Sequence, residues 1–289
     1  MASKLESVRA KSATHTGEVG EFWSNLEDIT GSDFNVTEKL CRAILRDQQV
    51  RAEVEPGTPE YEEGRAALVA PKRPSSPEEI KLSRQEVINH AKALNYAMDH
   101  IIIGSKPIDE NFIRSVHGIL CAGKVLGEDA GQPGVYRTWE IAARHGSDKK
   151  KSIFIRSSAV PQYMAELVED LQTDMLAVEG NKVVDPFDFA SRYCHRLACI
   201  HPFGDGNGRM CRILLNVILL KYAGFVSTFG GTEAERQEYL DLVRRSNKKF
   251  HDEDMEVPEE DKKGHRELAK FVLVKSKHAF DRLWGWATQ

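Results

Sequence analysis

The stretch His201-Pro-Phe-Gly-Asp-Gly-Asn-Gly-Arg-Met-Cys-Arg212 carries the strongest signal in the chain, and it lies between two segments with helical patterning. It predicts a loop that enters the N-terminus of a helix, because its glycines permit tight turns and a close backbone approach. The N–H groups from Gly206 to Gly208 can converge on an anion, and the positive end of the following helix dipole points at the same place. The stretch therefore predicts an anion-binding loop.

Four side chains of this stretch are suited to phosphate chemistry. Arg209 and Arg212 lie three residues apart and share a helix face, from which two guanidinium groups can hold phosphate oxygens. Asp205 offers a hard oxygen ligand for Mg²⁺. His201 is the natural general base, since histidine titrates near neutral pH. Each feature alone has an ordinary alternative (a turn, a solvated face, a structural histidine), but together they indicate a site for phosphate transfer.

The stretch resembles the motif of the Fic family, which has the Fido fold: His-x-Phe-x-Asp/Glu-Gly-Asn-Gly-Arg-x-x-Arg. It matches at every defined position, and Pro133-Gly-Val-Tyr-Arg137 is similar to the family's Pro-Gly-x-x-Arg segment before its flap. The similarity covers roughly residues 83–277 and is strongest to members with an N-terminal extension. It implies a mainly α fold, a Fic/Fido helical core with one β-hairpin flap.

The resemblance also implies an activity, the transfer of AMP from ATP to a Ser, Thr or Tyr hydroxyl of a protein. His201 would take the proton of the hydroxyl, and Asp205 would hold a Mg²⁺ cofactor that bridges the α- and β-phosphates. ATP phosphates would be bound by Gly206, Asn207, Gly208, Arg209 and Arg212. Tyr239 and Asn247, on a later helix, would hold the adenine or ribose.

The flap would receive an extended segment of the protein substrate by strand addition.

Two other functions stay open, the transfer of another phosphate-containing group and nucleotide-dependent regulation with little turnover. A zinc hydrolase is a more distant alternative, because Cys194, His195, Cys199 and His201 fit no common zinc spacing. The resemblance allows removal of AMP in some states, and it allows a homodimer.

Many similar proteins carry an inhibitory helix with the pattern Ser/Thr-x-x-x-Glu/Asp-Gly/Asn, whose acid pairs with the second arginine of the motif. The best candidate is Ser24-Asn-Leu-Glu-Asp28, in which Asp28 would pair with Arg212. Asp replaces the usual Glu, and Ile29 stands where Gly or Asn is usual. Glu27 could serve if the register differs by one, and residues 14–18 and 75–79 match loosely. The ordinary alternative is an acidic first turn.

Composition sets broader limits. The chain has 289 residues, of which 41% are hydrophobic and 29% charged, as expected of a folded, cytoplasmic protein. Its net charge of -4 argues against a protein that coats nucleic acid, and no apolar run is long enough for a membrane span. The N-terminus lacks the pattern of a secretory signal. The five cysteines are expected to be reduced, buried thiols.

Hydrophobic periodicity and capping residues predict the elements. Ser83–Glu86 matches a capping box and predicts a helix that begins there and runs to Gly104. Residues 51–76 are rich in proline and charge and predict a long loop. Residues 131–158 predict a β-hairpin, with apolar or β-branched runs over 139–142 and 153–155 on either side of a polar tip. The expected domains are an N-terminal extension, 1–82, and the core, 83–289. Further helices are predicted over residues 22–28, 37–49, 108–121, 161–179, 185–200, 208–223, 233–250 and 265–284.

Overall fold

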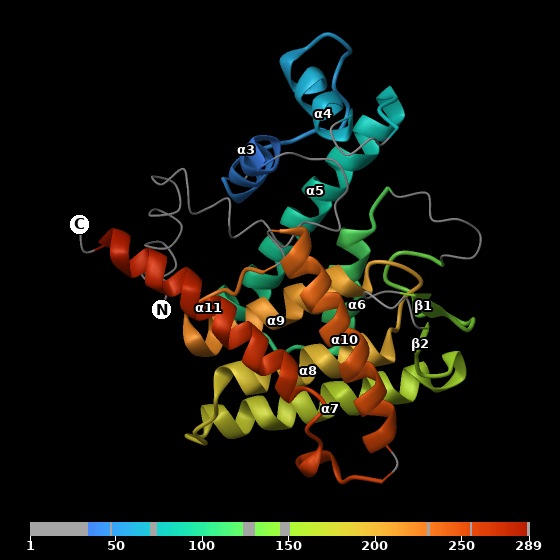
Figure 1. Cartoon of the computed structure of the whole chain (residues 1–289), viewed down its shortest axis with the longest axis vertical. Coiled ribbons are helices and arrows are strands. Elements are labelled where there is room, and N and C mark those ends of the chain that lie inside the picture. Colours follow the sequence, from blue (N-terminus) through green and yellow to red (C-terminus); the bar gives the residue numbers. More distant parts are fainter. Residues whose placement is uncertain are drawn as a thin grey trace.

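The computed structural model describes residues 34–46, 48–69, 74–123, 131–144, 151–229, 232–254 and 256–287. The described part is mainly α-helical with a single antiparallel strand pair, as predicted (Figure 1). The N-terminal half contains α3 (Phe34–Leu45), α4 (Pro59–Val69), α5 (Pro77–Met98), the π-helical turn η2 (Asp99–Ile103) and α6 (Glu110–Leu120). After it come β1 (Ala142–Arg144), β2 (Lys151–Ile153), the 3-10 turn η3 (Ser157–Ala159), α7 (Val160–Glu179), α8 (Pro186–Ile200), α9 (Asn207–Ala223), α10 (Glu233–Glu253), the 3-10 turn η4 (Glu259–Asp261) and α11 (Arg266–Ala287).

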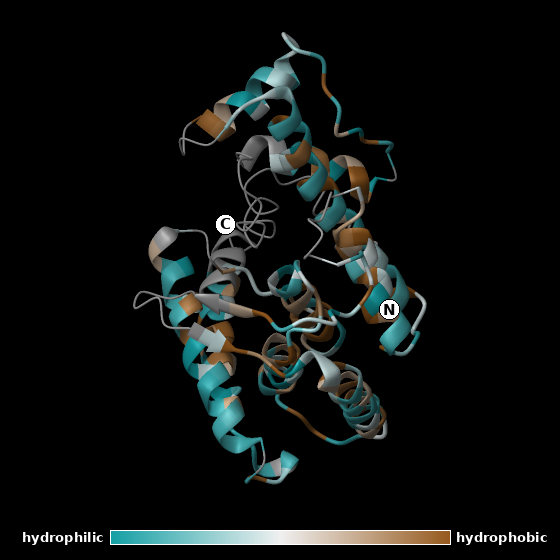
Figure 2. Ribbon diagram, turned by 90° about the vertical axis from the view of Figure 1, so that its right-hand side faces the viewer, coloured by the Kyte–Doolittle hydropathy of each residue, from teal (hydrophilic) through white to brown (hydrophobic). Residues whose placement is uncertain are grey.

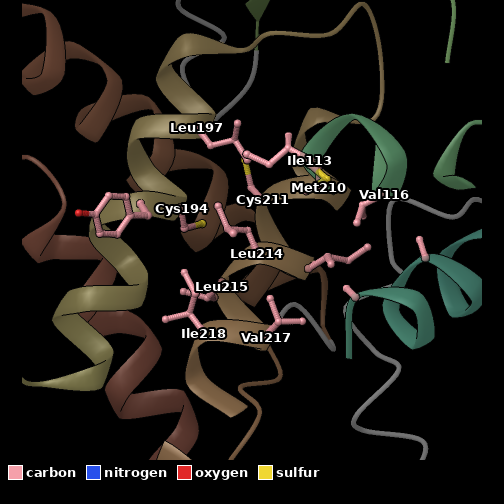
Figure 3. Close-up of a cluster of buried hydrophobic side chains, with 14 of the residues drawn as sticks. Ile113, Val116, Cys194, Leu197, Met210, Cys211, Leu214, Leu215, Val217 and Ile218 are labelled. Carbon is pink, nitrogen blue, oxygen red and sulfur yellow. The ribbon is translucent and has the colours of Figure 1, made fainter. Parts of the chain in front are cut away.

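Helix α9 lies at the centre of the core and packs against α8, α5 and α6 (Figure 1). Every residue from Met210 to Leu219 is buried, which is typical of a helix that is enclosed on all sides. Figure 3 shows Cys194 of α8 on one side of Leu214 and Val116 of α6 on the other. The longer helices mix hydrophobic and hydrophilic residues along their length (Figure 2). Because α9 is enclosed by other helices, its N-terminus has a fixed position in the fold.

The boundaries of α8 and α9 agree with the sequence analysis because local residues define them. Asp185 caps α8, and its carboxylate accepts a hydrogen bond from the N–H of Phe187 at 2.9 Å. Gly224 ends α9 in the left-handed conformation, with φ of 69°, as is common at helix C-termini. Residues 201–206, which we call the motif loop, therefore form a short connection between two helices with well-defined ends.

The start of α5 was predicted wrongly. Ser76 caps the helix, and its hydroxyl accepts from the N–H of Glu79 at 3.2 Å, whereas Ser83 is buried in the second turn. Ser76-Pro-Glu-Glu79 has the same capping-box pattern as Ser83–Glu86, and Pro77 additionally favours the first helical position. Helix α5 therefore runs through the expected boundary between residues 82 and 83, and the division into two domains stays a prediction.

The long loop predicted for residues 51–76 is also wrong, because α4 lies within it. Tyr61 and Leu68 of α4 pack with Ile80 of α5 in a small second hydrophobic cluster. A β-carbon on Gly64 would come within 3.0 Å of Ile80, so this glycine allows the two helices to approach closely. Few residues of α4 are buried, and its apolar pattern is correspondingly weak.

The predicted hairpin is present, but its strands are shifted. Ala142 pairs with Ile153 and Arg144 with Lys151. The sequence analysis placed the second strand over residues 153–155, whereas Phe154 and Ile155 leave the pairing and are buried, each 7% exposed. Burial of these two side chains in the core takes precedence over extension of the strand pair.

Three further predictions concern the N-terminal region and the cysteines. The helix expected over residues 37–49 is α3, which begins at Phe34 and ends at Leu45. The helix expected over residues 22–28 lies outside the described residues. None of the five cysteines forms a disulfide, and all five are buried, as expected. Burial raises the pKa of Cys41 and Cys199, which favours the protonated thiols.

Within the described residues, no helix is long and apolar enough to cross a lipid bilayer.

We expect acid to destabilise the fold through His195, which is 6% exposed and whose Nε2 lies 3.0 Å from the carbonyl oxygen of Ser246. Burial lowers the pKa of His195 to about 4, against about 6.5 in an unfolded chain. The unfolded state then binds more protons between these values, so stability falls as the pH drops through that window. The expected loss between pH 7 and pH 5 is about 2 kcal/mol of the free energy of unfolding.

Urea unfolding at both pH values measures this loss. His195→Gln keeps an amide that can donate to the Ser246 carbonyl but does not titrate, so its pH dependence should be shallower by about the same 2 kcal/mol. An equal pH dependence in wild type and variant would contradict the assignment to His195.

Candidate active site

His201 occupies the C-cap of α8 in the left-handed conformation, with φ of 52°, which is uncommon for a residue other than glycine. Its Nδ1 lies 3.3 Å from the carbonyl oxygen of Ala198. Because a carbonyl can only accept, this contact favours the proton on Nδ1 and makes Nε2 the basic nitrogen. The ring of Phe154 stacks against the imidazole with 3.8 Å between ring centroids. The imidazole is therefore held from both its edge and its face.

The loop after His201 is closed by Asn207. Its Oδ1 accepts from the N–H of Phe203 at 3.0 Å, and its Nδ2 donates to the carbonyl of Phe203 at 2.8 Å. The amide is 3% exposed, so the structure gives it a loop-closing role that the sequence analysis did not predict. The Phe203 ring is fully buried and stacks on His117 with 3.6 Å between centroids.

The N-terminus of α9 has the features of an anion site. Gly206 has φ of 76°, and a β-carbon there would come within 3.2 Å of Cys121 Sγ and 3.3 Å of His117 Nε2. The N-cap residue is this glycine, which has no side chain to accept a hydrogen bond from the first N–H groups of the helix. An anion placed at this end would receive both the N–H groups and the positive end of the dipole.

The charged residues of the motif lie around this helix end. Arg209 is 4% exposed and forms ion pairs with Glu86 of α5 at 3.6 Å and with Asp205 at 3.4 Å. Its Nη1 is buried and has no hydrogen-bond partner among the described residues. Arg212 is 7% exposed, while the side chain of Asp205 is 39% exposed. The structure thus places two buried cations and one accessible carboxylate at the end of α9.

His117 of α6 was missed by the sequence analysis. Its Nδ1 accepts from the N–H of Gly134 at 2.9 Å, so Nε2 carries the proton and donates to the carbonyl of Asp205 at 2.9 Å. Burial lowers the pKa of His117 to about 4, which keeps the ring neutral at neutral pH. His117 therefore joins the motif loop to the segment before the hairpin. The contact spans 88 residues of sequence, and no local pattern reveals it.

The two residues expected to hold the adenosine lie on α10, in the wall of a small cavity of about 10 Å³. Asn247 is 5% exposed, and its Nδ2 has no hydrogen-bond partner among the described residues. The Tyr239 ring packs against Phe229 at 5.0 Å between centroids. Phe154, which stacks on His201, lines the same cavity.

The other sequence-based candidates have different outcomes. Ser24 and Asp28, proposed for an inhibitory helix, lie outside the described residues. In the described part of the chain, no group of three or more His, Cys, Asp or Glu side chains is arranged to hold a metal ion, so the zinc alternative finds no ligand cluster there. A carboxylate that binds Mg²⁺ together with nucleotide phosphates needs no such cluster.

The fold and the site define a helical protein in which a glycine-rich loop connects the His201 end of α8 to the N-terminus of α9. The model of the Fic/DOC family matches residues 107–219. A Fido domain-containing protein of Dictyostelium discoideum is 30% identical over 117 residues, which are 40% of this chain and 73% of that protein. The chain belongs to the Fic/DOC family.

Two further proteins show how much of the chain and of its relatives the similarity covers. Protein adenylyltransferase Fic of Nematostella vectensis is 28% identical over 169 residues, 57% of this chain, and the chain spans only 35% of that protein's length. A Fic domain-containing signaling protein from Bacteroides thetaiotaomicron has a TM-score of 0.57 at 17% identity, with 93% of this chain and 97% of that chain covered. The second similarity supports the fold alone.

Proposed function

We propose that the protein is a Mg²⁺-dependent adenylyltransferase that moves AMP from ATP to a hydroxyl side chain of a protein. The observation that carries the proposal is the N-terminus of α9, which has two buried arginines, the Asp205 carboxylate and His201 around it. This arrangement suits a polyphosphate better than a single carboxylate ligand, because it offers several separated donors and cations. Similar proteins named as adenylyltransferases support the same activity.

The residues of the site fit ATP with magnesium. The exposed carboxylate of Asp205 is the natural oxygen ligand for Mg²⁺, and Arg209 has a buried Nη1 that lacks a hydrogen-bond partner among the described residues. Bound Mg²⁺ would neutralise charge on the phosphates as pyrophosphate leaves. Arg209 would exchange its long ion pair with Glu86, at 3.6 Å, for shorter bonds to phosphate oxygens.

The chain's own groups then account for the transfer. His201 Nε2 accepts the proton of the attacking hydroxyl while its Nδ1 proton stays directed at Ala198. The hydroxyl oxygen forms a bond to the α-phosphorus, and the bond from that phosphorus to the bridging oxygen of the β-phosphate breaks. N–H groups at the start of α9 stabilise charge on the α-phosphate, and Arg209 and Arg212 hold the leaving pyrophosphate.

Adenosine would bind beside Tyr239 and Asn247. The buried Nδ2 of Asn247 can donate to a ring nitrogen or ribose oxygen, and leaving it without an acceptor is unfavourable. The cavity volume of about 10 Å³ holds no more than one water molecule. Adenosine binding in this cavity would therefore require a lining side chain such as Tyr239 to move.

The protein substrate would bind at the hairpin by strand addition. Ile153 is 63% exposed on β2, and the next residue along the chain, Phe154, contacts His201. A segment paired with this hairpin would bring its hydroxyl close to the base. Main-chain hydrogen bonds of this kind accept many sequences, so geometry rather than side-chain identity would select the target.

A nucleotide panel tests the proposal against its rivals. The protein is incubated with Mg²⁺ and ATP, another nucleoside triphosphate or a phosphocholine donor, and its intact mass is measured for self-modification. A mass increase of one AMP with ATP supports the proposal. An increase with another donor only would show transfer of a different group, and binding of ATP without modification of the chain or of added proteins would indicate a nucleotide-dependent regulator.

We further propose that the N-terminal segment holds the enzyme in an inhibited state through Asp28 and Arg212. Asp28→Gly should then increase the rate of self-modification at least about tenfold, the size expected from the loss of one charged contact to a buried arginine. Glu27→Gly is the matched variant, because it removes the neighbouring acid and distinguishes the two registers. The rate is measured by intact mass over time. Equal rates in wild type and both variants would contradict inhibition through this segment.

A further inference from the structure

Arg137 is a fully buried arginine that joins the hairpin to the end of α8. It is 2% exposed. Its guanidinium donates from Nε to the carbonyl of His201 at 2.8 Å, from Nη1 to Trp139 at 2.9 Å, and from Nη2 to Ile155 and, at 3.3 Å, to Ile200. We call these four carbonyls and the guanidinium the Arg137 network.

The acceptors of the Arg137 network belong to the two regions whose relative position the reaction needs. Trp139 precedes β1 and Ile155 follows β2, so the guanidinium holds both ends of the hairpin. Ile200 and His201 form the C-terminal end of α8, which carries the proposed base. One rigid planar group with fixed donor directions therefore sets the distance between hairpin and base.

The charge of Arg137 is balanced mainly by these carbonyls. Its ion pair with Glu140 is long, at 3.9 Å, and that carboxylate is 64% exposed. The carbonyl oxygens at the C-terminus of α8 carry the negative end of the helix dipole, which is favourable for a cation. Burial lowers the pKa of Arg137, but arginine remains charged at any physiological pH.

The conformation of His201 needs such support. A histidine keeps the left-handed conformation only where its surroundings stabilise it. Arg137 makes two hydrogen bonds to the peptide groups that follow His201. The guanidinium binds the His201 carbonyl, and the main-chain N–H of Arg137 donates to the carbonyl of Pro202 at 2.9 Å. Phe154, next to Ile155, adds the stacking contact on the imidazole.

We propose that Arg137 is a positioning residue, which holds His201 in its left-handed conformation and fixes the hairpin at the distance where a bound segment meets the base. The kinetic part rests on the proposed function of His201, whereas the orientation of the imidazole does not. A shift of about 1 Å between base and acceptor is enough to cost roughly 10²-fold in rate. The side-chain hydrogen bonds of Arg137 all go to the Arg137 network rather than to the start of α9, so ATP binding should not depend on it.

The test replaces Arg137 with Lys, which keeps the charge but cannot reach four carbonyls with fixed directions. We expect the turnover number for AMP transfer to fall about 10- to 100-fold per folded molecule, with the Kd for ATP changed by less than about twofold. The matched control is Arg196→Lys, since Arg196 is also largely buried, on α8, but pairs with Asp170 at 2.8 Å. This control should leave both quantities unchanged.

A second measurement separates positioning from folding and from activity. Imidazole nitrogen chemical shifts of His201, in isotope-labelled protein, report which nitrogen carries the proton. Wild type and Arg196→Lys should show the proton on Nδ1, whereas Arg137→Lys should show a mixture of the two tautomers. The three proteins are compared under conditions in which the same fraction of each is folded. Wild-type shifts and turnover in Arg137→Lys would overturn the inference. If wild type transfers no AMP, the proposed function fails and the shifts alone decide the role of Arg137.

Discussion

Replacing His201 is expected to reduce the rate of AMP transfer by about 10² to 10⁴-fold, the usual contribution of a general base. The preferred variant is His201→Asn, because the site has φ of 52° and asparagine tolerates this left-handed conformation, whereas alanine would add strain. The proposed phosphate site lies on α9 and would stay intact, so the Kd for ATP should change little. The loss therefore concerns turnover rather than nucleotide binding.

Turnover and ATP binding are measured separately for the His201 variant. His100→Ala is the control, since that histidine lies on η2 and its Nε2 contacts the carbonyl of Pro107, away from the motif loop. The control should keep the wild-type rate. Undiminished transfer in His201→Asn would remove His201 from the reaction.

The second large effect is expected at Asp205. Asp205→Asn keeps the size of the side chain but removes the charge that would hold Mg²⁺, and we expect transfer to fall roughly 10²-fold or more. The Mg²⁺ concentration for half-maximal rate should rise in the variant. ATP binding without Mg²⁺ should become no weaker, because Arg209 loses its 3.4 Å ion pair with Asp205 and becomes more available to phosphate.

Magnesium titrations of transfer by wild type, Asp205→Asn and Asp170→Asn measure this effect. The side chain of Asp170 is 45% exposed and pairs with Arg196 of α8 rather than with a residue of the motif, so its variant should follow the wild-type curve. An Asp205→Asn curve that matches wild type would exclude this carboxylate as the magnesium ligand.

The sequence predicts the parts of the fold that local residues define. Asp185 caps α8, Gly224 ends α9, and the glycines of the motif permit the loop between them. The mainly α class and the hairpin also follow from local patterns. The start of α5 differs from the prediction because two capping boxes occur in succession, and Pro77 at the first helical position favours the earlier one.

The supporting residues of the site could not be predicted in the same way. His117 and Asp205 are 88 residues apart, and Arg137 and His201 are 64 residues apart. Their roles depend on backbone carbonyls, which leave no trace in residue type or spacing. Asn207 was expected at the phosphates, but its buried amide closes the loop with Phe203, a distinction that only the three-dimensional contacts reveal.

The central claim is that AMP, rather than another part of the nucleotide, is transferred with the help of His201. It is tested most directly with ATP labelled at either the α- or the γ-phosphate, added with Mg²⁺ to wild type, Asp28→Gly and His201→Asn. We predict stable labelling of protein from the α-phosphate only, strongest in Asp28→Gly and lost in His201→Asn. Labelling from the γ-phosphate, or equal α-labelling in His201→Asn, would contradict the account.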